Sequence, residues 1–117
     1  MNEFTMIYRS AQIPDVQFSP EQMQDVLKQW HAWFGSIAAQ NKIANLGNRL
    51  GFEGATVREG VVTDGPYAEI KEMITGYTIL KVDTLDEAID IAKGCPVLKI
   101  GGSVEVRAVM PVSMKMD

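Results

Sequence analysis

The sequence predicts an α+β fold in which an antiparallel sheet carries two helices on one face. Two observations support this fold class: several stretches alternate with the period of a strand, and two others repeat with the spacing of a helix. The length of 117 residues fits one domain spanning 1–117. Hydrophobic residues make up 46% and charged residues 22%, which is the balance of a globular protein.

The first strand and the first helix have clear local signals. Residues 3–9 alternate between two kinds of side chain, as a strand with two different faces does. Ser19 is predicted to cap a helix over about 19–40, with Pro20 at its first position and Gln22 at capping-box spacing. The helix has an apolar stripe that we expect to be buried against the sheet. The stripe consists of Met23, Val26, Leu27, Trp30, Phe34, Ile37 and Ala38.

The middle of the chain predicts a weak strand and a short hairpin. The weak strand covers 42–50 and is interrupted by a glycine. The hairpin joins 56–58 to 61–62 across Glu59 and Gly60. A tight turn follows at 64–66, because Asp can bond its own backbone and Pro fixes φ.

The second half of the chain completes the sheet. Residues 73–82 have the longest strand pattern, and Thr84 with Glu87 predicts a second capping box. Gly94 is predicted to end that helix in a left-handed conformation, before a last strand over 104–109. The order strand, helix, strand, hairpin, strand, helix, strand predicts a ferredoxin-like βαβ-βαβ sheet.

The long strand predicts that both faces of the sheet are apolar. One face takes Ile74, Thr78, Leu80 and Val82, and the other takes Met73, Thr75, Tyr77, Ile79 and Lys81. Since two helices cover only one face of an antiparallel sheet, we expect a homodimer whose sheets meet face to face. Three methionines in the last eight residues, Met110, Met114 and Met116, either lie across that partner or fray.

Composition excludes several classes of protein. The net charge is −4 and the basic residues are dispersed, so no nucleic-acid partner is expected. The single Cys95 allows no intrachain disulfide and indicates a reducing compartment. No apolar stretch approaches the ~20 residues that span a bilayer. We therefore expect a cytoplasmic protein that does not bind membranes.

Residues 62–72, VTDGPYAEIKE, resemble the TDGPFAETKE signature of the DGPF branch of YCII-related proteins. Tyr67 stands where the signature has Phe, and Ile70 stands where it has Thr. The resemblance extends over essentially the whole chain. It continues through Thr75-Gly76-Tyr77, Leu85-Asp86-Glu87-Ala88, Cys95-Pro96 and residues 102–107.

This resemblance implies a ferredoxin-like domain that forms a dimeric α/β barrel. Some relatives are regarded as small-molecule enzymes with a proposed His-Asp pair, and some DGPF members are encoded near extracytoplasmic-function sigma factors. His31 is the one histidine of this sequence, so it is the candidate for the histidine of that pair. Histidine suits general acid-base catalysis because its ordinary pKa lies near neutrality. The relatives' aspartate corresponds to the segment at Cys95, so Asp64 is the substitute candidate. The alternative for His31 is an ordinary histidine on a helix without a catalytic role. The alternative for Asp64 is a turn with a purely structural role.

Two groups of residues are candidates for binding a small polar or anionic ligand. The first follows the 64–66 turn, and the second lies on predicted strands. They comprise Tyr67, Glu69, Lys71 and Glu72, and then Arg58, Tyr77, Glu105 and Arg107. A structural ion pair between Glu105 and Arg107 is the alternative for the second group. No metal or cofactor site is predicted. One histidine and one isolated cysteine cannot form the usual nitrogen and sulfur ligand sets, and the sequence has no glycine-rich phosphate loop.

Two functions remain open at this stage. The first is a small-molecule enzyme or binder with a polar pocket at the Asp64 turn. The second is a non-catalytic interaction module linked to transcriptional regulation.

Overall fold

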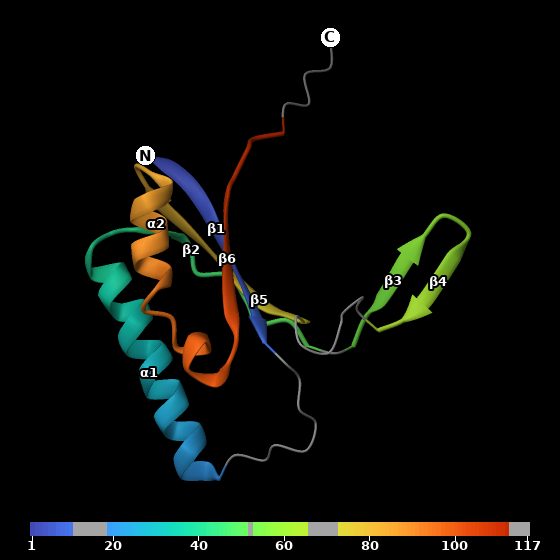
Figure 1. The fold of residues 1–117 in the computed structure, drawn as a ribbon, viewed down its shortest axis with the longest axis horizontal. Coiled ribbons are helices and arrows are strands. Elements are labelled where there is room, and N and C mark those ends of the chain that lie inside the picture. Colours follow the sequence, from blue (N-terminus) through green and yellow to red (C-terminus); the bar gives the residue numbers. More distant parts are fainter. Residues whose placement is uncertain (11–18, 52, 66–72, 113–117) are drawn as a thin grey trace.

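The computed structural model describes residues 1–10, 19–51, 53–65 and 73–112 (Figure 1). In chain order the elements are β1 (Asn2–Ser10), α1 (Pro20–Ala39), β2 (Ile43–Asn45), β3 (Ala55–Arg58), β4 (Val61–Asp64), β5 (Met73–Val82), α2 (Leu85–Ala92), the 3-10 helix η1 (Pro96–Ile100) and β6 (Ser103–Ala108). Four strands form an antiparallel sheet in the order β2-β5-β1-β6, while β3 and β4 form a separate hairpin. The α+β prediction is confirmed, and this strand order is that of a ferredoxin-like sheet.

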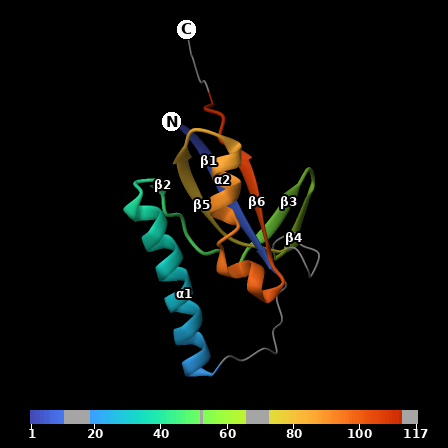
Figure 2. The same cartoon turned by 60° about the vertical axis from the view of Figure 1, so that its left-hand side comes forward.

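The two faces of the four-stranded sheet have different neighbours. Both α-helices and η1 lie on one side of it, and the β3–β4 hairpin projects from the other side (Figures 1 and 2). The predicted element order is therefore confirmed, except that sequence reasoning did not identify η1. The loop at 11–18, the segment 66–72 and the last two methionines lie outside the described residues.

The starts of both helices follow their sequence signals. The Ser19 side chain accepts a hydrogen bond from the Gln22 amide, and the Gln22 side chain accepts one from the Ser19 amide, which completes the predicted capping box. At α2, the Thr84 hydroxyl accepts from the Glu87 amide. The Glu87 carboxylate instead accepts from the Asp83 amide and pairs with Lys42 at 3.0 Å, so this box is only half formed.

The end of α2 corrects one prediction. The helix ends at Ala92, its C-cap Lys93 keeps a right-handed conformation, and Gly94 is not among the glycines with positive φ. Close packing explains the glycine instead, because a Cβ atom at Gly94 would lie 3.1 Å from Nε1 of Trp33. That indole nitrogen donates a hydrogen bond to the Ile91 carbonyl at 3.1 Å, which ties α1 to α2.

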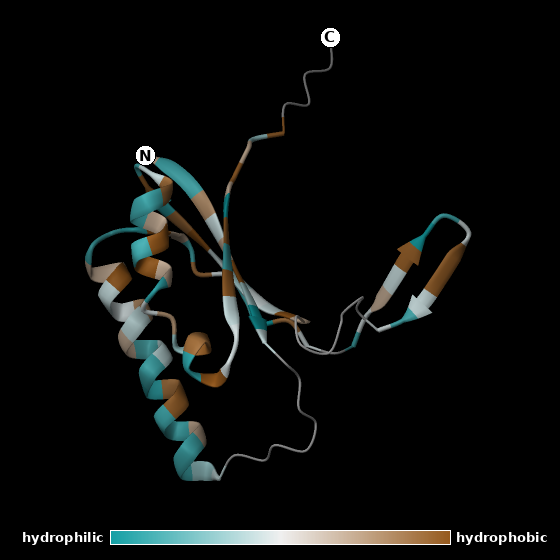
Figure 3. Ribbon diagram, in the orientation of Figure 1, coloured by the Kyte–Doolittle hydropathy of each residue, from teal (hydrophilic) through white to brown (hydrophobic). Residues whose placement is uncertain are grey.

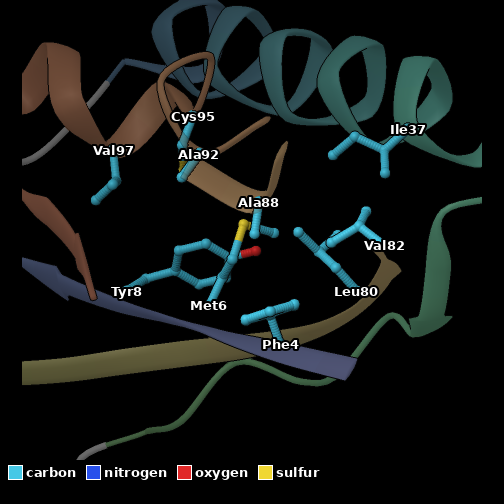
Figure 4. Close-up of a cluster of buried hydrophobic side chains, with 10 residues drawn as sticks. All are labelled: Phe4, Met6, Tyr8, Ile37, Leu80, Val82, Ala88, Ala92, Cys95 and Val97. Atoms are coloured by element: carbon cyan, nitrogen blue, oxygen red, sulfur yellow. The ribbon is translucent and has the colours of Figure 1, made fainter. Parts of the chain in front are cut away.

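The hydrophobic core fills the space between the sheet and the helices (Figure 4). Its members come from β1, α1, β5, α2 and the segment around η1: Phe4, Met6, Tyr8, Ile37, Leu80, Val82, Ala88, Ala92, Cys95 and Val97. The Tyr8 hydroxyl donates to Thr78 at 2.6 Å, and the Thr78 hydroxyl donates to the Leu46 carbonyl at 2.8 Å. This relay satisfies the polar groups within the core, and burial raises the pKa of Tyr8.

Helix α1 is less buried than its stripe predicts. Of that stripe only Ile37 is fully buried, and Trp30 and Phe34 are half-buried. Met23 and Leu27 remain 40% and 47% exposed. The physical reason is that the N-terminal half of α1 extends beyond the sheet, so its apolar residues have no strand beneath them (Figure 1).

A β-bulge corrects the assignment of one residue to a face. The β1–β5 register shifts between Tyr8 and Arg9, so that Tyr8 pairs with Gly76 whereas Arg9 pairs with Ile74. Directly paired residues share a face, which places Ile74 with Arg9 on the side away from the helices. Gly76 sits at this bulge because a Cβ atom there would lie 2.9 Å from the Asn48 carbonyl oxygen.

Truncation of a core residue tests this packing. Leu80 has no exposed surface, so Leu80→Ala should lower the free energy of unfolding by about 2–5 kcal/mol through lost burial and an internal cavity. Leu98→Ala is the matched control, because Leu98 is 43% exposed and should cost much less. Urea denaturation of both variants measures the difference, and equal losses would contradict the described core.

The buried cysteine provides a second test. Cys95 is 2% exposed, and burial raises its pKa to about 11 despite an opposing backbone hydrogen bond with Val97. Since the thiolate is the reactive form, an aromatic disulfide reagent at pH 8 should modify the native protein far more slowly than the denatured protein. Equal rates in the two states, followed by absorbance of the released thiol, would contradict this packing of Cys95.

Candidate functional site

The candidate site is the face of the sheet that the helices leave uncovered, here called the open face. Besides Ile74, its residues include the following side chains at alternate positions of three neighbouring strands: Thr5, Ile7 and Arg9 of β1, Tyr77, Ile79 and Lys81 of β5, and Glu105 and Arg107 of β6. Ile74 and Arg107 are exposed, and the others are half-buried. The face therefore combines apolar surface with charged and hydroxyl groups.

The register fixes the neighbours on the open face. Ile7 pairs with Tyr77 on one side and with Glu105 on the other, and Thr5 pairs with Ile79 and with Arg107 in the same way. Neighbouring strands lie about 4.8 Å apart, so the backbones of Tyr77 and Glu105 are roughly 10 Å apart, and Ile7 lies between them. Ile7 therefore separates Tyr77, which carries a hydroxyl group, from the charged side chains around Glu105. Together with Ile79, Ile7 forms what is here called the apolar strip.

Three charged side chains make that cluster. The Arg9 guanidinium contacts Oε1 of Glu105, with Nη2 at 3.2 Å and Nε at 3.3 Å. Nη1 of Arg107 lies 3.8 Å from Oε2 of the same carboxylate, too far for a hydrogen bond. Glu105 is therefore shared by two guanidinium groups, and its stronger contact is with Arg9.

This geometry extends the predicted ion pair. Glu105 and Arg107 do lie together, but Arg9 is the closer partner and sequence reasoning missed it. A usable signal was present, because Arg9 follows Ile7 by two positions and must share its face. The pairing of β1 with β6, which brings Arg9 beside Glu105, was the missing information.

Tyr77 presents the hydroxyl group at the other end of the strip. Nδ2 of Asn48 donates to this hydroxyl at 3.4 Å, which leaves the phenolic proton able to donate to another group. The segment that carries Asn48 is held against β5 by a hydrogen bond from the Tyr77 amide to the Asn48 carbonyl. A Cβ atom at Gly47 would lie 1.8 Å from the Tyr77 carbonyl oxygen, so a glycine is required for this close approach.

Two candidate residues lie on the hairpin rather than on the sheet. Arg58 ends β3 and Asp64 ends β4, and both are exposed. The base of the hairpin is closed by a hydrogen bond from the Gly65 amide to the Gly54 carbonyl at 2.8 Å. Gly65 has a φ of 79°, so the described part of the predicted turn has the left-handed backbone that glycine favours.

Within one chain, His31 lies apart from the candidates on the open face and on the hairpin. It is exposed on α1, in the layer on the helical side of the sheet, whereas Asp64 belongs to the hairpin on the opposite side (Figure 1). The structure of the single chain does not bring these two residues together. The remaining candidates, Tyr67, Glu69, Lys71 and Glu72, lie outside the described residues.

Two further features concern metal binding and membrane insertion by the described residues. Among residues 1–10, 19–51, 53–65 and 73–112, no group of three or more His, Cys, Asp or Glu side chains could hold a metal ion. Neither described α-helix has the length and apolar character needed to cross a membrane.

Comparisons with known proteins gave a short sequence match and a structural likeness. An uncharacterized protein of Rhizobium meliloti strain 1021 is 46% identical over 35 residues, which is 30% of this chain and only 28% of that protein. A 5-chloro-2-hydroxyhydroquinone dehydrochlorinase from Burkholderia phenoliruptrix AC1100, solved in complex with 2,5-dihydroxybenzoquinone, is similar in structure with a TM-score of 0.44. It shares 19% sequence identity, and the likeness covers 89% of this chain and 90% of that one.

The family comparison gives the broadest match. The model of the YCII-related domain matches residues 4–113, which include every described strand and helix except the first two residues of β1. This chain belongs to the YCII-related domain family.

Proposed function

We propose that this YCII-related domain is a homodimeric small-molecule-binding domain that holds a small organic anion on its open face. One observation carries the proposal: Glu105 lies between two guanidinium groups at the edge of an apolar strip. The signature at 62–72 further supports assignment to the DGPF branch.

The charged cluster favours an anion. Glu105 makes its closer contacts with the Arg9 guanidinium, so this carboxylate compensates the charge of Arg107 only in part. Arg107 is 71% exposed and contacts Glu105 only loosely, so its fork of N–H donors is available to a carboxylate or phosphate. Arg107 is the residue that we assign to anion binding.

The strip beside the cluster favours an apolar body on that anion. Ile7 and Ile79 offer an aliphatic surface, and the Tyr77 hydroxyl can donate to a polar group at the far end. Ligand sites commonly combine an apolar lining with a few placed polar groups. His31 stands outside this arrangement, so the geometry supports binding by the open face more directly than catalysis by a His31–Asp64 pair.

The dimer forms the second part of the proposal. Ile7, Tyr77 and Ile79 keep partial access to solvent because no helix covers them. A second copy applied face to face would remove this apolar surface from water, at about 25 cal/mol per Å². It would also exclude water from the charged cluster, which strengthens the attraction between Arg107 and an anion.

Matched ligands test the binding site. Benzoate carries a carboxylate on a flat apolar body, and benzamide is its uncharged counterpart. If benzoate binds with a dissociation constant near ~1 mM, 10 mM benzoate should raise the melting temperature by about 5 °C, whereas benzamide should not. Differential scanning fluorimetry measures both shifts.

Two charge-removing variants complete that test. Arg107→Met keeps an unbranched stem but loses the charge, so it should abolish the benzoate shift. Lys99→Met removes an exposed cation from η1 and should preserve the shift. A shift that persists in Arg107→Met, or that benzamide reproduces, would refute the assignment of Arg107.

A charge placed on the open face tests the dimer. Ile79→Glu should dissociate the dimer into folded monomers, because a carboxylate would be buried between two apolar sheets. Ile89→Glu is the control, since Ile89 is a 37% exposed residue of α2. Sedimentation equilibrium at micromolar concentration should find a dimer for the wild type and for Ile89→Glu. A monomeric wild type, or a dimeric Ile79→Glu, would contradict the proposed interface.

A further inference from the structure

We infer that the β3–β4 hairpin is an arm that packs against a second copy of this chain through the face carrying Val57 and Val62. This inference deepens the proposed function and rests on its dimer. It assigns an interaction to a part of the molecule that the open face leaves unexplained.

The arm carries a pair of exposed valines on one of its faces. Val57 pairs directly with Val62, so both side chains lie on the same face of the hairpin, together with the pair Ala55 and Asp64. Val57 is 73% exposed and Val62 is 67% exposed. Figure 3 shows hydrophobic residues on both strands of the arm, although it projects away from the sheet.

An isolated hairpin of this kind needs support. Each strand has four residues, and a two-stranded hairpin alone is marginally stable in water. The bond from Gly65 to Gly54 closes the base of the arm but covers neither valine. Packing against another surface would supply the missing stabilisation and remove the valines from water.

The position of the arm identifies the occupant as a second copy. The arm projects on the side of the sheet opposite the helices, which is the side of the open face (Figures 1 and 2). A copy seated on the open face would lie beside the arm, and the two-fold relation would give each subunit the same contact. Because Asp64 shares the face of Val57 and Val62, docking also brings this carboxylate to the interface.

Isosteric substitutions test the arm without removing it. The double variant Val57→Thr with Val62→Thr keeps the shape and the β-propensity of the strands but places two hydroxyl groups in the contact. Val61→Thr is the matched control, because Val61 is 52% exposed and pairs with Arg58 on the opposite face. The double variant should raise the dimer dissociation constant about tenfold or more, whereas the control should change it less than about twofold.

Hydrogen exchange supplies an independent readout. The arm's amides should be protected in the wild-type dimer and should exchange rapidly in the Ile79→Glu monomer, since the free hairpin is marginal. Circular dichroism checks that each variant keeps its fold.

The outcomes separate the arm from the proposed dimer. If Ile79→Glu dissociates the dimer but the double valine variant binds as tightly as the wild type, the arm inference is wrong and the dimer stands. The same holds if the arm's amides exchange equally fast in the dimer and the monomer. If the wild type is monomeric, the dimer and the arm fail together, whereas binding of benzoate to Arg107 is tested separately.

Discussion

The distribution of the helices over the sheet governs the rest of this structure. Because α1 and α2 lie on the same side, β5 alternates between residues with no contact with solvent, such as Leu80, and residues with partial access, such as Ile79. The first set forms the core with Met6 and Tyr8. The second set creates an apolar surface that the described helices of a single chain do not cover, and this surface is where a ligand or a second copy could pack.

The energetic importance of the charged cluster depends on whether that surface is covered. Arg9 and Glu105 on a fully solvated face would be an ordinary ion pair of small energetic value. On a face that a second sheet covers, each charge must keep a partner, because an unpaired buried charge is very costly. Arg9 meets this requirement through Glu105, but the loosely held Arg107 needs a further anion or access to water.

Local signals predicted the elements better than the contacts between them. The capping box at Ser19 and the alternation of β5 depend on neighbouring residues, so the sequence alone located both elements. The face of Ile74 depends on a bulge opposite β1, and the role of Gly94 depends on Trp33, which lies some sixty positions earlier in the chain. The exposed start of α1 likewise reflects the short reach of the sheet, which no local pattern records.

The candidate site was predictable to the same extent. The two-residue spacing of Glu105 and Arg107 placed both on one face, but the nearer partner Arg9 comes from a strand almost a hundred residues away. His31 and Asp64 were joined only by a family resemblance, and in one chain they belong to opposite sides of the sheet. In the proposed face-to-face dimer, His31 would stay on the outer layer, whereas the hairpin of one copy would lie toward the sheet of the other. The proposal therefore gives Asp64, but not His31, a route to a composite site between two copies, and a role for Asp64 should depend on the proposed dimer.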